Sequence, residues 1–332
     1  MGAPSPRVER HRAIASELQQ ASDDDLLAAL LAAGLSPRGR GVLDVAGRQV
    51  FVKLLPLTAL ELRPEHRDTT ANVFDLPTFY QYRIGSFGFG VWRELEMHRH
   101  ANEWVLSGQC AQLPLLHHRR MLPIVPDRID DLSAAWGDDA AIRRRACEIQ
   151  AARTSAVLFL EHFPQTLQEW LRDPLQDEAA CATVVRETEA ALLRILSFTG
   201  SQGVLHMDVH LENVLTDGRT LFLADHGLAL ARSFDLAADE RAFLARHETF
   251  DRCTAITSLV HAVVTRYDTQ DDWRAALRGQ IDGAGEMPAD LRGYLARRGP
   301  VALAMGDFYR RLLDDLQAEY PAEELERLLD GP

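Results

Sequence analysis

The sequence feature that most constrains the fold is Asp217-Gly218, a dipeptide that separates two apolar runs. Asp-Gly in this setting is a strong signal for a tight β-hairpin turn. We therefore expect strand 213–216 to leave a loop and strand 220–224 to return antiparallel to it, which would bring Asp225 back beside Asn213. A carboxylate and an amide oxygen held together at a loop suit Mg²⁺, which takes few protein oxygens and completes its shell with water and phosphate.

Asp208 lies on the same loop, five residues before Asn213. Its carboxylate could accept a proton from an attacking hydroxyl group. The sequence therefore predicts a general base and a pair of metal ligands within one short segment.

Lysine usage points to a second functional position. Of the 36 basic residues, 35 are Arg and only one is Lys, at position 53. Lys53 ends a strand-turn-strand pattern made of residues 42–45 and 50–53, and the alternation of side chains places it on one strand face with Phe51.

The rest of the chain predicts an α+β protein, with strands early and helices late. Residues 9–34 are expected to be helical and separate, residues 56–90 irregular, and residues 157–160 a buried strand that Pro164 ends. Further helices are expected at about 91–106, 166–171, 178–199 and 236–247.

Composition excludes several classes of protein. No apolar run reaches the roughly 18 residues of a membrane span, and the amino-terminal residues lack the apolar stretch of a signal peptide, so we expect a cytoplasmic protein without a membrane partner. The four Cys residues lie at least 34 positions apart, which fits reduced thiols. The net charge of −13 makes nucleic acid an unsuitable partner.

The loop resembles the protein-kinase-like superfamily, whose catalytic loop reads His-x-Asp-x-x-x-x-Asn and whose metal motif is Asp-Phe-Gly. Here the corresponding residues are His206, Asp208 and Asn213, followed by Asp225-His226-Gly227. The resemblance implies a two-lobed fold, with a small antiparallel-sheet N-lobe and a mainly helical C-lobe.

The same resemblance implies the roles of individual residues. Lys53 would hold the α- and β-phosphates of ATP, Asp208 would be the catalytic base, and Asn213 and Asp225 would bind Mg²⁺. The family also pairs its lysine with a helix glutamate. Of the two candidates in helix 91–106, Glu94 shares a face with apolar residues, whereas Glu96 neighbours charged ones, so we favour Glu94.

Other parts of the nucleotide site are less distinct. Glu161-His162-Phe163 falls where the family contacts adenine with backbone groups, although Glu161 itself could be only a charge at the rim. Gly39 and Gly41 are the candidates for a phosphate loop, but they lack the family's glycine spacing. His226 replaces the Phe of the metal motif.

His210 helps to choose a branch of the superfamily. Aminoglycoside and choline kinases often carry His two residues after the base Asp, and Asp208-Val-His210 resembles them. This imidazole could bind the transferring phosphate or orient Asp208; a purely structural role stays open. Residues 35–330 also resemble a group of actinobacterial kinase-like proteins, through the segments at 79–82 and 88–95.

These features predict a helical extension at 1–34, an N-lobe at 35–160 with an insertion at 56–90, and a C-lobe at 161–332. The predicted function is a Mg·ATP-dependent phosphotransferase that acts on a hydroxyl of a small molecule or short peptide. Two alternatives are a Ser/Thr kinase for a protein or a biosynthetic precursor peptide, and a nucleotide-binding pseudokinase that serves as an interaction module.

The charge of the second half bears on the acceptor. Residues 165–332 carry 29 acidic and 17 basic residues, a net charge of −12, which leaves −1 for residues 1–164. Acidic cleft walls concentrate cations, so we expect a cationic small-molecule or peptide acceptor; acidic helix faces that serve only solubility are the alternative.

Overall fold

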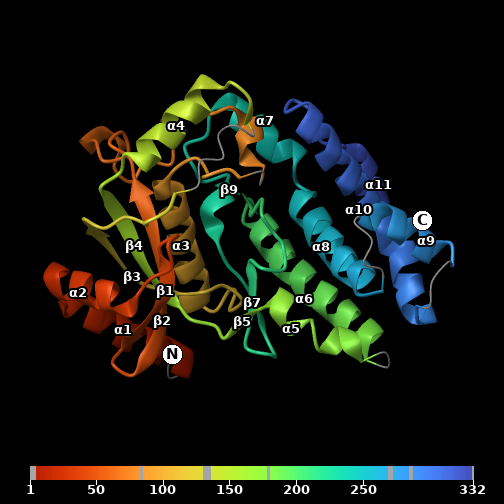
Figure 1. The fold of residues 1–332 in the computed structure, drawn as a ribbon, viewed down its shortest axis with the longest axis horizontal. Helices are drawn as coiled ribbons and strands as arrows, with labels where there is room; N and C mark the ends of the chain where they lie inside the picture. Colours follow the sequence, from red (N-terminus) through yellow and green to blue (C-terminus); the bar gives the residue numbers. More distant parts are fainter. Residues whose placement is uncertain are drawn as a thin grey trace. The chain divides into compact units, whose positions relative to one another are not determined.

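The structure is a computed structural model that describes residues 5–82, 85–129, 136–177, 180–267, 272–283 and 287–330. The chain divides into two compact units. Unit 1 contains Met1–Phe163, His226–Ala229 and Phe234–Ala237, and unit 2 contains Pro164–Asp225, Leu230–Ser233 and Ala238–Pro332. Small antiparallel sheets and many helices make up these units, which confirms the predicted α+β class (Figure 1).

Unit 1 is built on a four-stranded antiparallel sheet with the strand order β1-β2-β4-β3. The turn between β1 and β2 consists of Ala46 and Gly47, both with left-handed backbone angles, as tight hairpin turns require. The elements of unit 1 are α1 (Pro6–Gln20), α2 (Asp23–Ala33), β1 (Arg40–Val45), β2 (Arg48–Leu57), η1 (Pro64–His66), η2 (Thr78–Gln81), α3 (Val91–Leu106), β3 (Leu116–Leu122), α4 (Ala140–Gln150), β4 (Thr154–Glu161) and η5 (His226–Leu228).

Helices cover both faces of this sheet (Figure 1). Residues of α1 and α2, including Ile14 and Leu30, form one core cluster with Val50 and Val52 of β2. Residues of α3, including Trp92, pack on the other face. The amino-terminal helices therefore share the core of the sheet. They are two helices, because the side chain of Ser22 accepts the backbone N–H of Asp25 and starts a new helix there.

Unit 2 combines two small antiparallel sheets, β5-β7-β8 and β6-β9, with a helical core in which α10 packs on α8 and α9. The predicted hairpin is confirmed, since Val214 pairs with Leu223 and Thr216 with Leu221. The elements of unit 2 are β5 (Gln165–Thr166), α5 (Leu167–Trp170), η4 (Pro174–Gln176), α6 (Cys181–Ser201), β6 (Val204–Leu205), β7 (Val214–Thr216), β8 (Leu221–Leu223), β9 (Leu230–Ala231), α7 (Ala238–Arg246), α8 (Phe250–Tyr267), α9 (Trp273–Ile281), α10 (Ala289–Asp314) and α11 (Ala322–Asp330).

Most of the expected elements are present with small shifts at their ends. The expected helix at 91–106 has those bounds, and α5 and α7 correspond to the helices expected at 166–171 and 236–247. The helix expected at about 178–199 is α6; residues 178–179 lie outside the described residues. In the expected insertion at 56–90, the first two residues end β2, and the other described residues form only the short helices η1 and η2.

Candidate functional site

Lys53 lies on β2, and its position follows from the alternation of side chains in that strand. Val52 and Leu54 face the α1–α2 side of the sheet, where they are buried in the core. Successive side chains of a strand point to opposite faces, so Lys53 projects toward α3. The only lysine of the chain is thereby nearly buried, with 11% of its side chain exposed.

Glu94 of α3 binds this lysine. The distance from Lys53 Nζ to Glu94 Oε1 is 2.7 Å, and only 6% of the glutamate side chain is exposed. The Nε2 atom of His98, one turn further along α3, lies 3.8 Å from the same oxygen. Glu96 points elsewhere and binds Arg99, whose hydrogen bond lowers the pKa of the Glu96 carboxyl. The pairing expected from helical spacing is thus the one in the structure.

Glu161 differs from the expectation of a rim charge. Its carboxylate accepts two hydrogen bonds from Nε of Arg7 and one from the NH2 group, the shortest 2.6 Å long. The backbone N–H of Leu115 donates to it as well. The Glu161 carboxylate therefore anchors the start of α1, and the expected contact of its backbone with adenine stays a prediction. Phe163, two residues further, is half-buried.

Gly39 and Gly41 also have another explanation. A Cβ atom at Gly39 would lie 2.9 Å from side-chain atoms of Leu54 and Pro126, and one at Gly41 would lie 2.7 Å from Leu35. The space beside these glycines is filled by the core. Close packing favours a residue without a side chain at Gly39, whereas the contact at Gly41 is with the end of the Leu35 side chain. Their role in a phosphate loop stays a prediction.

In unit 2, Asp208 and Asn213 are in direct contact. The side-chain nitrogen of Asn213 donates to the carboxylate of Asp208 over 2.9 Å and to its backbone carbonyl over 3.0 Å. The amide oxygen is therefore the atom of Asn213 that can ligate a cation. The backbone of Asn213 also accepts the N–H of Ala224, which places Asn213 opposite the residue that precedes Asp225.

The backbone at this loop is strained at two positions. Met207 and Asp225 have φ angles of 64° and 61°, in the left-handed region that side-chain-bearing residues seldom adopt. Such strain persists where the surroundings hold it, and it clusters at functional sites. Met207 directly precedes the candidate base, Asp208. Asp225 is itself a candidate metal ligand.

Asp251 of α8 holds the first of these strained positions. Its two carboxylate oxygens accept the backbone N–H groups of His206 and Met207, at 2.6 and 2.8 Å. Burial raises the pKa of Asp251, and the two N–H donors act in the opposite direction. Sequence reasoning missed Asp251, because an acidic residue at the start of a helix 45 residues downstream carries no local signal of this contact.

The two histidines of the loop have different surroundings. His206 is buried, and its Nε2 donates to the carbonyl of Ala224 over 2.9 Å, so the ring ties the loop to the residue before Asp225. This contact suits a positioning role for His206, and its assignment as catalytic stays a prediction. His210 is partly exposed, with its Nε2 atom 3.6 Å from the carboxylate of Asp208 and Nδ1 3.8 Å from that of Glu212.

His226, which stands in place of the expected Phe, belongs to unit 1. Its ring meets that of His98 edge to face, with 5.0 Å between the centroids. His98 lies one turn after Glu94 on α3, so the residue that follows Asp225 packs beside the helix that holds the lysine partner.

The donor atoms of unit 2 fit the metal that the sequence implies. Mg²⁺ prefers oxygen ligands and keeps several waters and phosphate oxygens, so it needs only one or two protein ligands. The Asn213 amide oxygen and the Asp225 carboxylate are such ligands. In the described parts of the chain, no cluster of three or more His, Cys, Asp or Glu side chains could hold a metal ion by itself.

Comparisons with known proteins do not assign the chain. It matches no protein-family model, and no curated protein is significantly similar to it. Within the described residues, no helix is both long and apolar enough to cross a membrane. Inferences about function therefore rest on the residues themselves.

Proposed function

We propose that the chain is a Mg·ATP-dependent phosphotransferase with a two-lobed, protein-kinase-like fold that transfers the γ-phosphoryl group to a hydroxyl of a small molecule or short peptide. The observation that carries the proposal is the contact between Asp208 and Asn213, one ladder position from Asp225. The candidate base thus contacts one candidate ligand, and the second, Asp225, follows the residue whose backbone N–H bonds to Asn213.

Each residue has a defined task in this reaction. Lys53, fixed by Glu94, holds the α- and β-phosphates as a point charge. Asn213 and Asp225 would hold Mg²⁺, which would supply positive charge to balance that of the phosphates. Asp208 accepts the proton of the acceptor hydroxyl, and the amide of Asn213 orients its carboxylate. The residues thus position the reactants and balance charge, as phosphoryl transfer requires.

A second candidate is a nucleotide-binding interaction module without turnover. It is favoured by the short β1–β2 turn of Ala46 and Gly47, by Gly39 and Gly41, which lack the glycine spacing of the family's phosphate loop, and by His226 in place of Phe. Turnover separates the two candidates.

The first experiment is a screen of the purified protein with labelled ATP and Mg²⁺ against aminoglycosides, nucleosides, choline-like amines and peptide pools. Lys53→Arg is expected to reduce turnover by orders of magnitude while the protein stays folded, because a forked planar cation does not fit a site built for an ammonium. Turnover within a factor of a few of the wild type would contradict the role of Lys53.

A thermal-shift measurement tests the metal ligands without an acceptor. Asp225→Asn is expected to weaken the stabilisation by Mg·ATP more than that by ATP alone, since a ligand stabilises only through its binding to the folded state. Asp208→Asn should keep nucleotide binding and lose transfer. Asp217→Asn, in the exposed hairpin turn, is the matched control and should change neither. Equal Mg·ATP stabilisation of Asp225→Asn and the wild type would exclude the metal site.

A further inference from the structure

A buried ion pair in unit 1 is unexplained by the proposed chemistry. Glu61 follows β2, and Arg145 lies on α4; their side chains are 1% and 2% exposed, and Arg145 NH1 lies 3.5 Å from Glu61 Oε1. Charged groups this deeply buried cost free energy that their mutual attraction often fails to recover. A purely stabilising role would be served as well by apolar side chains, so the contacts of the pair with other segments are the better explanation for its charges.

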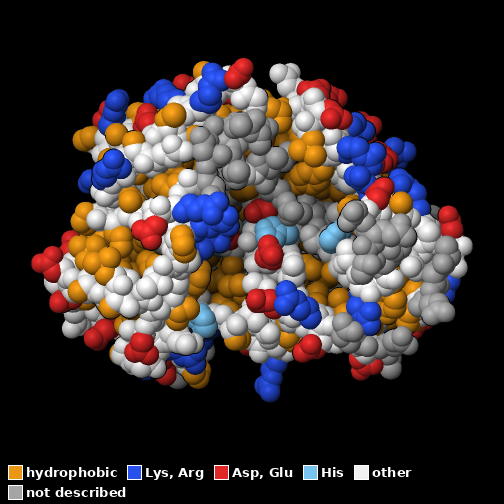
Figure 2. Space-filling view, viewed as in Figure 1, with side chains coloured by type: hydrophobic (Ala, Val, Ile, Leu, Met, Phe, Trp, Pro, Cys, Tyr) orange, Lys and Arg blue, Asp and Glu red, His pale blue; other side chains and the backbone are white. Residues whose placement is uncertain are grey.

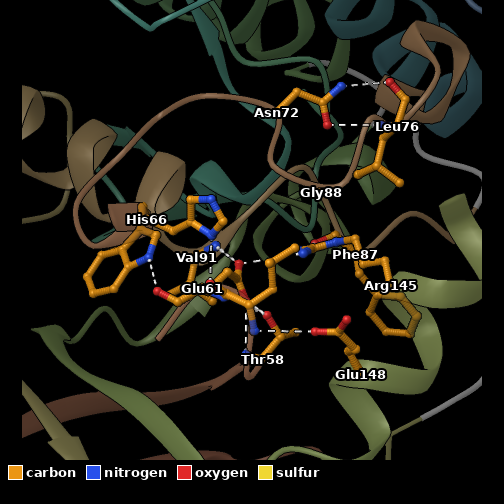
Figure 3. Close-up of polar contacts among 12 residues, drawn as sticks. Thr58, Glu61, His66, Asn72, Leu76, Phe87, Gly88, Val91, Arg145 and Glu148 are labelled. Carbon is orange, nitrogen blue, oxygen red and sulfur yellow. Dashed lines mark hydrogen bonds and ion pairs between the residues drawn. The ribbon is translucent and has the colours of Figure 1, made fainter. Parts of the chain in front are cut away.

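Glu61 caps the helix that carries Glu94. The residue before α3, Gly90, has no side chain to accept the first N–H groups of the helix. Glu61 Oε1 accepts the N–H of Val91 over 2.9 Å, while Oε2 accepts the N–H and hydroxyl of Thr58 (Figure 3). The backbone carbonyl of Glu61 also accepts the indole N–H of Trp92. These bonds fix the first turn of α3, three residues before Glu94.

Arg145 connects this cap to a second segment. Its NH2 group donates to the carbonyl of Phe87 over 3.3 Å (Figure 3). Its guanidinium also lies 5.0 Å from the ring centroid of Phe74. One guanidinium group thus touches both the cap of α3 and the glycine-rich loop at 85–90.

That loop packs directly on the residues that follow Asp225. Gly88 has a φ angle of 68°, and a Cβ atom there would overlap the carbonyl oxygen of Gly227. The side-chain nitrogen of Gln81 donates to the carbonyl of Leu228. Further along, the hydroxyl of Thr70 accepts the N–H of Asp235. Within unit 1, the insertion therefore contacts the backbone of Gly227, Leu228 and Asp235.

We propose that Glu61 and Arg145 are a positioning pair that couples the setting of α3, and hence of Glu94, to the segment after Asp225. The coupling itself follows from contacts within unit 1. Its relevance to catalysis rests on the proposed function. In this proposal, the insertion holds the start of α3 and the residues after Asp225 in fixed positions.

The coupling is tested by substitution at its far end. Gly88→Ala breaks the contact with Gly227 and leaves both charges of the pair in place. Gly34→Ala is the matched control, because Gly34 has nearly the same φ angle, 63°, and nothing within 4 Å of the added atom. Both variants incur the backbone strain of a left-handed alanine, and only the first breaks the contact.

Backbone hydrogen exchange of the nucleotide-free protein reads the result. We expect Gly88→Ala to accelerate exchange at least tenfold both at residues 226–229 and in the first turn of α3, and Gly34→Ala to accelerate it at neither. Faster exchange at 226–229 alone would overturn the coupling. Hydrogen exchange does not depend on turnover, so it tests the coupling even if the protein is not a phosphotransferase.

A double variant tests the ion pair itself. Glu61→Gln with Arg145→Met removes both charges, so neither is left buried alone, and the protein is expected to fold. We expect accelerated exchange in α3 and at 226–229 together and, where turnover is measured, a kcat at least tenfold lower at saturating Mg·ATP. Wild-type exchange at both segments in the folded double variant would overturn the proposal. If the double variant does not fold, the hydrogen exchange of Gly88→Ala alone tests the coupling.

Discussion

The charged groups of the two units are fixed by different means. In unit 1, Lys53 is held by a side-chain ion pair with Glu94, whose helix depends on a second ion pair, Glu61–Arg145, across 84 residues. In unit 2, Asp208 is held by backbone geometry, since Asp251 binds the loop through two N–H groups. Opposite charges on side chains hold Lys53, whereas hydrogen bonds to strained backbone hold the loop of Asp208. We therefore expect substitutions in the two units to lower stability for different reasons.

The largest effect is expected at the ion pair of unit 1. Glu94→Leu leaves the ammonium of Lys53 buried without its carboxylate and should lower the free energy of unfolding by about 3–5 kcal/mol. Glu96→Leu on the same helix should change it by less than about 1 kcal/mol, because Glu96 is partly exposed and bonded to the exposed Arg99. Urea denaturation measures both. Equal losses would show that Glu94 has no special role in stability.

A double variant sharpens this prediction. Lys53→Met with Glu94→Leu removes both charges and should recover most of the stability that Glu94→Leu loses. Recovery would identify the cost as that of an unpaired buried charge, whereas an additive loss would assign it to packing.

The next effect concerns the backbone of unit 2. Asp251→Ala leaves the N–H groups of His206 and Met207 buried without acceptors, at a cost of about 2–4 kcal/mol. Asp251→Asn keeps one acceptor oxygen and should lose less. Denaturation curves that coincide for Asp251→Ala and the wild type would mean that the loop does not depend on these bonds.

Acid should reveal a smaller difference, because each unit buries a neutral histidine. Burial lowers the pKa of His117 to about 3 in unit 1 and that of His247 to about 4 in unit 2. The unfolded chain binds these protons near pH 6.5, so stability is lost as the pH falls below that value, by at most about 1.4 kcal/mol per pH unit for each histidine.

Replacement by Phe separates the two contributions. His117→Phe and His247→Phe should each flatten the fall in stability between pH 6.5 and 4.5, measured by urea denaturation across that range. The Nδ1 atoms of His117 and His11 lie 2.9 Å apart and join β3 to α1. Protonation of His117 is expected to weaken this contact. An unchanged slope in either variant would show that the histidine concerned is already accessible to protons.

The smallest effect concerns the net charge of the second half of the chain. Once an acceptor is known, a cationic one should lose kcat/KM severalfold as the Debye length shrinks from about 30 to 10 Å. Figure 2 shows acidic and basic side chains interspersed over α10 and α11, which favours a modest dependence. A neutral or anionic acceptor, or a value that ignores ionic strength, would contradict the steering prediction alone.

Elements with local signals could be predicted from the sequence. Asp217-Gly218 specifies its hairpin through the turn itself, and the pairing of Lys53 with Glu94 follows from alternation in a strand and from the face of a helix. Strand β3 was missed, because Arg119 and Arg120 interrupt its apolar pattern and its pairing with β4 supplies the hydrogen bonds.

Contacts between distant segments could not be predicted in this way. Glu61 and Arg145 lie 84 residues apart, and Arg7 and Glu161 lie 154 apart. In each case the neighbouring residues suggest an ordinary surface charge, and only the packed fold shows the pairing, which is buried for Glu61–Arg145 and partly buried for Arg7–Glu161. The residues that hold the site therefore lie outside the motifs that predict it.

The rarity of lysine gives the molecule a built-in chemical reporter. Apart from any α-amine, Lys53 carries the only primary amine of the chain, and it is hydrogen-bonded to Glu94 and nearly buried. An ammonium held by a carboxylate reacts poorly with amine-directed acylating reagents. Mass-spectrometric labelling of intact protein could therefore follow the opening of this one ion pair directly, without an introduced probe.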